Sequence, residues 1–194
     1  METDSLTPEK SFELITQVIT EARTKFTENG FIYMFWGALI AIASLSQFIL
    51  LKNEYYSINY YPYFLMPIGG IFTGYYFSKK KNKSKQNQIS KIVSVVWIVL
   101  SLNMMLLGFV FANMLKESLI PVILILQGVG MVISGGAVKS KLLMYAGIAV
   151  NISGFVCFNL DWIYHSLLAG IVAIIAIFIP GVISMVKHKK EQNV

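Results

Sequence analysis

Six stretches of this chain contain no Asp, Glu, Lys or Arg, and each is long enough to cross a membrane as a helix. A bilayer core of about 30 Å requires about 20 apolar residues, because lipid offers no hydrogen-bond partner to an open backbone. The predicted spans cover residues 31–51, 61–78, 92–115, 118–138, 142–160 and 164–186. The sequence therefore predicts an all-α, polytopic bundle of six transmembrane helices.

The composition agrees with this class of protein. Of the 194 residues, 56% are hydrophobic and 13% are charged, whereas about a quarter of the residues in soluble domains are charged. The N-terminal leader is acidic and polar and lacks the basic start of a cleaved signal peptide, so we expect it to be retained. We divide the chain into an amphipathic N-terminal helix (residues 1–30), a transmembrane domain (31–187) and a cytoplasmic tail (188–194).

Basic residues gather on one side of the predicted membrane. Of the 16 Lys and Arg, only Lys52 and Lys116 lie on the opposite side. The positive-inside rule then places both termini in the cytoplasm. The basic loop after the second span contains Lys79, Lys80, Lys81, Lys83, Lys85 and Lys91. Because these lysines flank spans, we interpret them as topology signals and expect the lipid bilayer, and no nucleic acid, as their partner.

Residues 8–29 are predicted to form an amphipathic helix, with Thr7 as N-cap and Pro8 at the first helical position. Its apolar stripe, spaced by threes and fours, consists of Phe12, Ile15, Ile19, Ala22 and Phe26. Six acidic against three basic residues give residues 1–30 a formal charge of −3. We therefore predict that this helix docks near the basic loop, mainly by packing, with charge as a screened orienting effect.

Other destinations for the stripe stay open. Helices that lie on a membrane surface usually have a basic polar face, whereas this one is acidic. A plain in-plane helix, a partner protein and a homodimer through the stripe are the alternatives.

Amides are the polar side chains that the sequence places near the middle of spans. They are Asn103, Gln127 and Asn151, in the third, fourth and fifth spans, and Gln47 is a further amide in the first span. We interpret them as interhelical hydrogen-bonding groups, each bond worth about 0.6–2 kcal/mol, with a ligand site as the alternative. Because no ionisable Asp, Glu, Lys or Arg lies within a span, proton-driven or acid-coordinated ion transport is disfavoured.

Small residues form stripes that predict close packing of helices. These stripes are Gly37, Ala41 and Ser44; Gly70 and Gly74; Gly130, Ser134 and Ala137; and Gly147, Asn151 and Gly154. The pair Pro180 and Gly181 predicts a bend in the last span. Spans two, four and six each end in a similar stretch that runs into lysines, which hints at three repeated hairpins, although the topology rule alone produces such lysines.

One cluster of reactive side chains precedes the last span, namely Asp161, Tyr164, His165 and Ser166. Asp161 and His165 are four apart, so on a helical turn they could share a metal or a proton. Two ligands make an incomplete site, and we favour an interfacial turn with Trp162 and Tyr164 as aromatic anchors. Because HExxH, Walker A and GxSxG motifs are absent, we expect no catalytic residue, metal or cofactor. The single cysteine, Cys157, excludes an internal disulfide.

The leader runs into the first span through Phe26, Glu28, Asn29, Tyr33, Trp36 and Gly37. Here the chain resembles a group of small, uncharacterised bacterial integral membrane proteins, over its N-terminal 50 residues best. The resemblance implies an inner-membrane location and brings no assigned activity.

Two functions follow from these patterns. The first is a nonenzymatic regulatory or adaptor membrane protein that holds a partner through the N-terminal helix and the basic loop. The second is a carrier or binder of a neutral or lipid-like small molecule that uses the midplane amides. A membrane enzyme ranks third, because catalysis in a membrane still needs convergent polar groups.

Overall fold

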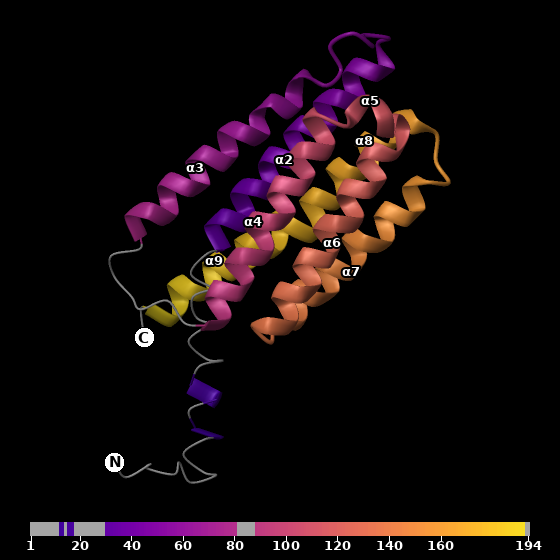
Figure 1. Ribbon diagram of the computed structural model, residues 1–194. Helices are drawn as coiled ribbons and strands as arrows, with labels where there is room; N and C mark the ends of the chain where they lie inside the picture. The colour runs from indigo at the N-terminus through magenta and orange to yellow at the C-terminus, as the bar shows by residue number, and fades with distance from the viewer. Residues whose placement is uncertain (1–11, 14, 18–29, 81–87, 193–194) are drawn as a thin grey trace.

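The computed structural model describes residues 12–13, 15–17, 30–80 and 88–192, and these residues are almost entirely helical (Figure 1). In order, the elements are α2 (Gly30–Lys52), η1 (Tyr61–Phe64), α3 (Leu65–Lys80), α4 (Gln88–Phe109), α5 (Ala112–Leu115), η3 (Lys116–Ser118), α6 (Leu119–Ala137), α7 (Lys141–Cys157), α8 (Trp162–Ala173), η4 (Ile174–Phe178) and α9 (Ile179–Gln192). No strand occurs in these ranges. The predicted all-α class is confirmed.

Four helical stretches are long and apolar enough to cross a membrane. They are Gly30–Lys52, Gln88–Phe109, Ala112–Ala137 and Trp162–Val186. Helix α7 is apolar but has 17 residues, and α3 has 16 residues. Helices therefore lie over all six predicted ranges, and four of them reach the length of a full span.

The helices form two closely packed groups (Figure 1). Helices α6 and α7 make an antiparallel hairpin, and α2 lies along α8, η4 and α9. Helix α4 packs against α6, while α3 lies at the edge of the bundle against α2. Fully buried Met131 of α6 and Val150 and Cys157 of α7 belong to the apolar core.

Glycine lets the backbones approach within both groups. A Cβ atom added at Gly128 of α6 would lie 2.5 Å from the backbone nitrogen of Asn151, and one at Gly147 of α7 would lie 2.7 Å from that of Val132. On α2, a Cβ at Gly37 would lie 2.5 Å from the backbone nitrogen of Phe178. These contacts confirm that the stripes of spans one and five are packing surfaces, because only a small residue permits such an approach.

Gly70 and Gly74, predicted as a packing surface, have no partner helix among the described residues. No described atom of another element lies within 4 Å of a Cβ built on either residue. Gly69 faces α2 instead, where an added Cβ would lie 2.6 Å from Leu39 Cδ2. Residues four apart share one helix face, so Gly70 and Gly74 lie together on the face that is turned away from α2.

Two predicted boundaries are refined. The range 92–115 is not one helix, because α4 ends at Phe109 and α5 continues through η3 into α6. Residues 110 and 111 at the break are uncharged, so the charge pattern did not reveal it. Near Pro180, where a bend was expected, the structure has the π-helical segment η4, which ends two residues before the proline. Proline has no N–H to bond the carbonyl of Ala176, and the helix widens there.

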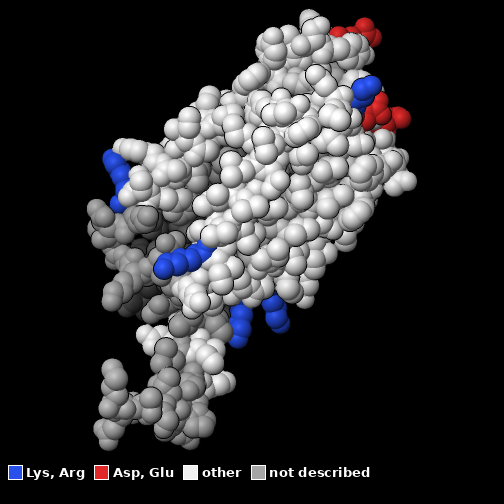
Figure 2. Space-filling model, in the orientation of Figure 1, with Lys and Arg blue, Asp and Glu red and all other residues white. Residues whose placement is uncertain are grey.

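Charged side chains gather at the two ends of the bundle (Figure 2). The described lysines Lys79, Lys91, Lys139 and Lys141 flank the ends of α3, α4, α6 and α7 on one side. The carboxylates Glu54, Glu117 and Asp161 lie in the turns at the opposite end, together with Lys52 and Lys116. We call this opposite end the acidic end.

Candidate functional site

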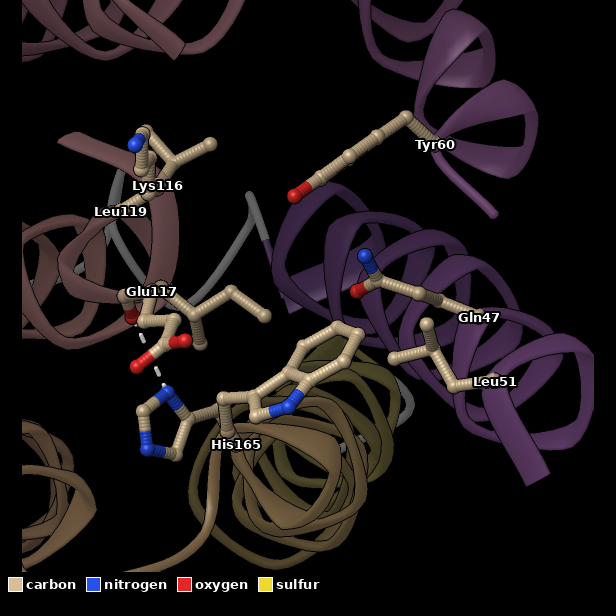
Figure 3. A pocket seen from close by; sticks show the side chains of 9 residues that line it. Gln47, Leu51, Tyr60, Lys116, Glu117, Leu119 and His165 are labelled. Carbon is tan, nitrogen blue, oxygen red and sulfur yellow. Dashed lines mark hydrogen bonds between the residues drawn. The ribbon is translucent and has the colours of Figure 1, made fainter. Parts of the chain in front are cut away.

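A small cavity lined by both polar and apolar side chains lies at the acidic end (Figure 3). Its walls come from α2, the loop before η1, the segment η3 with the start of α6, and the start of α8. The centre of a water molecule can occupy about 20 Å³ of it, which is room for about one water. The cavity therefore suits a single polar group rather than a whole small molecule.

Gln47 lines one wall of the cavity and is hydrogen-bonded to a second buried amide, Asn59, behind it. Gln47 of α2 is 2% exposed and Asn59 is 3% exposed. Gln47 Nε2 donates to Asn59 Oδ1 over 3.0 Å, and Asn59 Nδ2 donates to the carbonyl oxygen of Tyr56. A backbone carbonyl only accepts, so it fixes the orientation of Asn59, which in turn fixes the orientation of Gln47.

This chain of hydrogen bonds leaves Gln47 Oε1 facing the cavity. The oxygen is buried and has no hydrogen-bond partner among the described residues. Figure 3 shows the Gln47 amide and the Tyr60 hydroxyl directed into the same space. A buried acceptor without a donor costs about 1–3 kcal/mol, so this atom marks the place where a donor would bind. Sequence reasoning found Gln47 only as an amide in a span, since its partner depends on how the loop folds back.

The other wall carries charge. Lys116 and Glu117 lie across the cavity from Gln47 and Tyr60 (Figure 3). Burial, with a further contribution from the negative charge of Glu117, raises the pKa of the Tyr60 phenol. Tyr60 thus keeps its proton at neutral pH and can donate. Lys116 has φ 46° and ψ −118°, a backbone conformation that favours glycine.

His165 lies between η3 and the turn before α8 at the acidic end. It is 5% exposed, and its Nδ1 and Nε2 each lie 3.0 Å from a backbone carbonyl oxygen, of Glu117 and Leu160 respectively. Since carbonyls only accept, both contacts are hydrogen bonds only when both ring nitrogens carry a proton. His165 thereby ties η3 to the turn before α8.

The predicted cluster around His165 is not assembled as a reactive site. Ser166 Oγ donates to the carbonyl of Ile163 over 3.1 Å, and no hydrogen bond in the described part of the chain joins Asp161 to His165. The ring of Trp162 lies 6.1 Å from that of Tyr56, and Lys52 Nζ lies 5.9 Å from the Tyr164 ring. These contacts fit an interfacial turn with aromatic anchors.

The three midplane amides have separate environments. Asn103 is exposed on α4 and donates to Val99 of its own helix over 2.8 Å. Asn151 of α7 donates to the carbonyl of Ile125 in α6 over 3.1 Å, so it bonds between helices as predicted. Gln127 is buried in α6. No hydrogen bond links the three within the described ranges, and their role as a ligand site stays a prediction.

The N-terminal stripe and the basic loop are described only in part. Phe12 is 73% exposed and Ile15 is 58% exposed, while Ile19, Ala22 and Phe26 lie outside the described residues. Lys79 and Lys91 are exposed. Lys81, Lys83 and Lys85 lie outside the described residues, as does the side chain of Lys80, so the docking of the N-terminal helix on the loop stays a prediction.

Comparison of the chain with protein-family models, with curated proteins and with solved structures finds no match. The functional argument therefore depends on the chain's own residues.

Proposed function

We propose that the chain is a six-span protein of a bacterial inner membrane, with both termini in the cytoplasm, that acts as a nonenzymatic regulator or adaptor. The helices over all six predicted ranges support the six spans. The separation of lysines from carboxylates supports the orientation, because lysines accumulate on the cytoplasmic side.

The exposure of Phe12 and Ile15, the two described residues of the N-terminal stripe, is the observation that carries the adaptor role. Phe12 and Ile15 are large apolar side chains on helical residues ahead of the bundle, 73% and 58% exposed. Exposed apolar residues at helical spacing mark surfaces that bind another helix or a membrane. The acidic character of residues 1–30 favours a protein partner over an anionic lipid surface.

The size of the cavity at the acidic end supports the same choice. Ligand pockets usually enclose about 300–1,000 Å³, whereas this cavity has room for about one water molecule. Elsewhere, glycine contacts bring α6 against α7 and α2 against α9.

The adaptor role is tested by gentle extraction from the native membrane and native mass spectrometry of the intact complex. We expect a stoichiometric protein partner on the full chain and its loss from the variant with Phe12→Ser and Ile15→Ser. Gln17→Ala, on the same described segment but on the opposite helix face, is the matched control and should keep the partner. Retention of that partner after deletion of residues 1–28 would contradict the proposal.

A binder of a neutral or lipid-like molecule is the second candidate function. The observation that favours it is the buried, unpartnered oxygen of Gln47.

A further inference from the structure

We propose that the cavity at the acidic end binds the hydroxyl group of a neutral lipid or alcohol, which donates to Gln47 Oε1 and accepts from the Tyr60 hydroxyl. The orientation of the Asn59 and Gln47 side-chain amides decides which kind of group the cavity can bind. The carbonyl of Tyr56 orients Asn59, Asn59 orients Gln47, and the remaining atom is an acceptor. The occupant must therefore supply a hydrogen-bond donor.

The charges around the cavity select among possible donors. Lys116 and Glu117 both line the cavity, so their opposite charges favour neither a cation nor an anion. A carboxylate or phosphate would in addition place its lone pairs against the lone pairs of Gln47 Oε1. A neutral hydroxyl both donates and accepts, and so matches an unpartnered acceptor beside the protonated Tyr60.

The size and lining of the cavity indicate what kind of molecule carries the hydroxyl. The cavity accommodates one water-sized group and is partly open to the outside. Leu51, Leu119 and Ile120 line it together with the polar groups. A hydroxyl at the end of an apolar chain would thus place its polar end on Gln47 and its carbon atoms against these side chains.

The location indicates where such a molecule comes from. The aromatic side chains of Tyr55, Tyr56 and Tyr61 are exposed at this end, as is typical of the headgroup zone of a membrane. A lipid headgroup hydroxyl or a free alcohol could reach the cavity there. The inference rests on the proposed membrane location and does not depend on a partner of the N-terminal segment.

Tyr60 provides the most useful variant, because its ring is half-exposed and only its hydroxyl is removed by Tyr60→Phe. Its neighbour Tyr61 is 63% exposed and does not line the cavity, so Tyr61→Phe is the matched control. Gln47→Met removes the acceptor at nearly constant volume and is the second variant. Tyr60→Phe keeps the test decisive where Gln47→Met fails to fold.

The experiment uses the full chain in detergent micelles doped with a monoacylglycerol, or with a fatty-acid methyl ester of the same chain length that has no hydroxyl. Retained lipid is counted by native mass spectrometry. We expect the wild type to retain the monoacylglycerol and not the methyl ester. Tyr60→Phe should weaken this retention about threefold to tenfold, which is the effect of one hydrogen bond. Gln47→Met should abolish the retention, and Tyr61→Phe should leave it unchanged. Thermal stabilisation by glycerol alone distinguishes a free alcohol from a lipid as the source of the hydroxyl. If glycerol stabilises the wild type but not Tyr60→Phe, the ligand is a free alcohol. If glycerol does not stabilise the wild type and the monoacylglycerol is retained, the ligand is a lipid.

Three results would overturn the inference. They are equal retention of the methyl ester, equal retention by the Tyr60→Phe and Tyr61→Phe variants, and a single ordered water on Gln47 with neither monoacylglycerol nor glycerol bound. The variant with Phe12→Ser and Ile15→Ser separates this inference from the adaptor role, since it should lose the protein partner and keep the lipid.

Discussion

The hairpin of α2 with α3 and the hairpin of α4 with α6 are held by the same polar contact. Trp36 Nε1 donates to Thr73 Oγ1 over 3.0 Å, and Trp97 Nε1 donates to Ser134 Oγ over 2.9 Å. The two residues are 37 positions apart in both hairpins.

The surroundings of the acceptors correspond as well. Each hydroxyl also donates to a glycine carbonyl four residues earlier, that of Gly69 over 2.8 Å and that of Gly130 over 2.7 Å. The two hairpins therefore share one contact, in which a tryptophan donates to a hydroxyl that donates to a glycine carbonyl.

The second helices of the two hairpins nevertheless have different surroundings. The glycine directly after the hydroxyl residue is Gly135 in α6 and Gly74 in α3. A Cβ at Gly135 would lie 2.6 Å from the backbone nitrogen of Met144 in α7, whereas no described atom of another element lies within 4 Å of one at Gly74. Core and lipid are equally apolar, so hydrophobicity does not decide which face is buried. A small residue is used for close packing only where another helix is present.

The largest effect should come from Gly135→Ala. The added methyl group would press on the backbone of α7, which cannot move aside as a flexible side chain can. We expect a loss of about 1–3 kcal/mol in the free energy of unfolding, measured by denaturant titration in detergent. An unchanged stability would show that α6 and α7 do not approach as closely as described.

Ser134→Ala should have the next largest effect. It removes one acceptor of the Trp97 indole at a fully buried position, where the indole also has a hydrogen bond with Tyr33. The expected loss is about 0.6–1.7 kcal/mol, the range of interhelical hydrogen bonds in membranes. Ser134→Thr, which keeps the hydroxyl, is the control, and a loss equal to that of Ser134→Ala would indicate that packing rather than the hydrogen bond matters.

Thr73→Val breaks the corresponding contact in the first hairpin at nearly constant shape. Among the described elements, α3 makes its main contacts with α2 and η1. We therefore expect local opening of α3 and less than about 1 kcal/mol of global destabilisation. Faster amide hydrogen exchange confined to α3 would confirm this. A global loss as large as that of Ser134→Ala would mean that the first hairpin is more deeply integrated.

Gly74→Ala should have the smallest effect and the opposite sign. Alanine favours a helix by up to about 1 kcal/mol over glycine, and the added methyl group meets open space. We expect stability that is unchanged or slightly raised, measured in parallel with Gly135→Ala. A clear loss would reveal a helix packed against this face in the membrane.

The sequence predicted the helices better than their contacts. Apolar runs located every helix of the bundle, because a span requires a length that chance seldom provides. The end of α4 was placed too late, since its turn at Val110 carries no charge. Gly70 and Gly74 were assigned to packing because spacing defines a shared face but not its direction.

The cavity could be predicted only in fragments. Gln47 was recognisable as a polar residue in a span, but its orientation depends on Asn59 and the carbonyl of Tyr56, and a backbone carbonyl has no sequence signature. Helical spacing allowed His165 to share a metal or a proton with Asp161, an alternative to the favoured interfacial turn, whereas its ring nitrogens lie near the carbonyls of Glu117 and Leu160. Contacts between segments far apart in the chain decided both cases.

The two-hairpin comparison requires that each hairpin cross the membrane and return, although α3 has only 16 residues. Single cysteines at Asn53, Asn113, Ser84 and Ser140, in chains that keep the buried Cys157, test this directly with a membrane-impermeant maleimide on intact and permeabilised cells. The proposed topology predicts labelling of the cysteines at 53 and 113 in intact cells, and of those at 84 and 140 only after permeabilisation. Labelling of positions 53 and 84 from the same side would show that α3 does not span the membrane and would contradict the six-span structure.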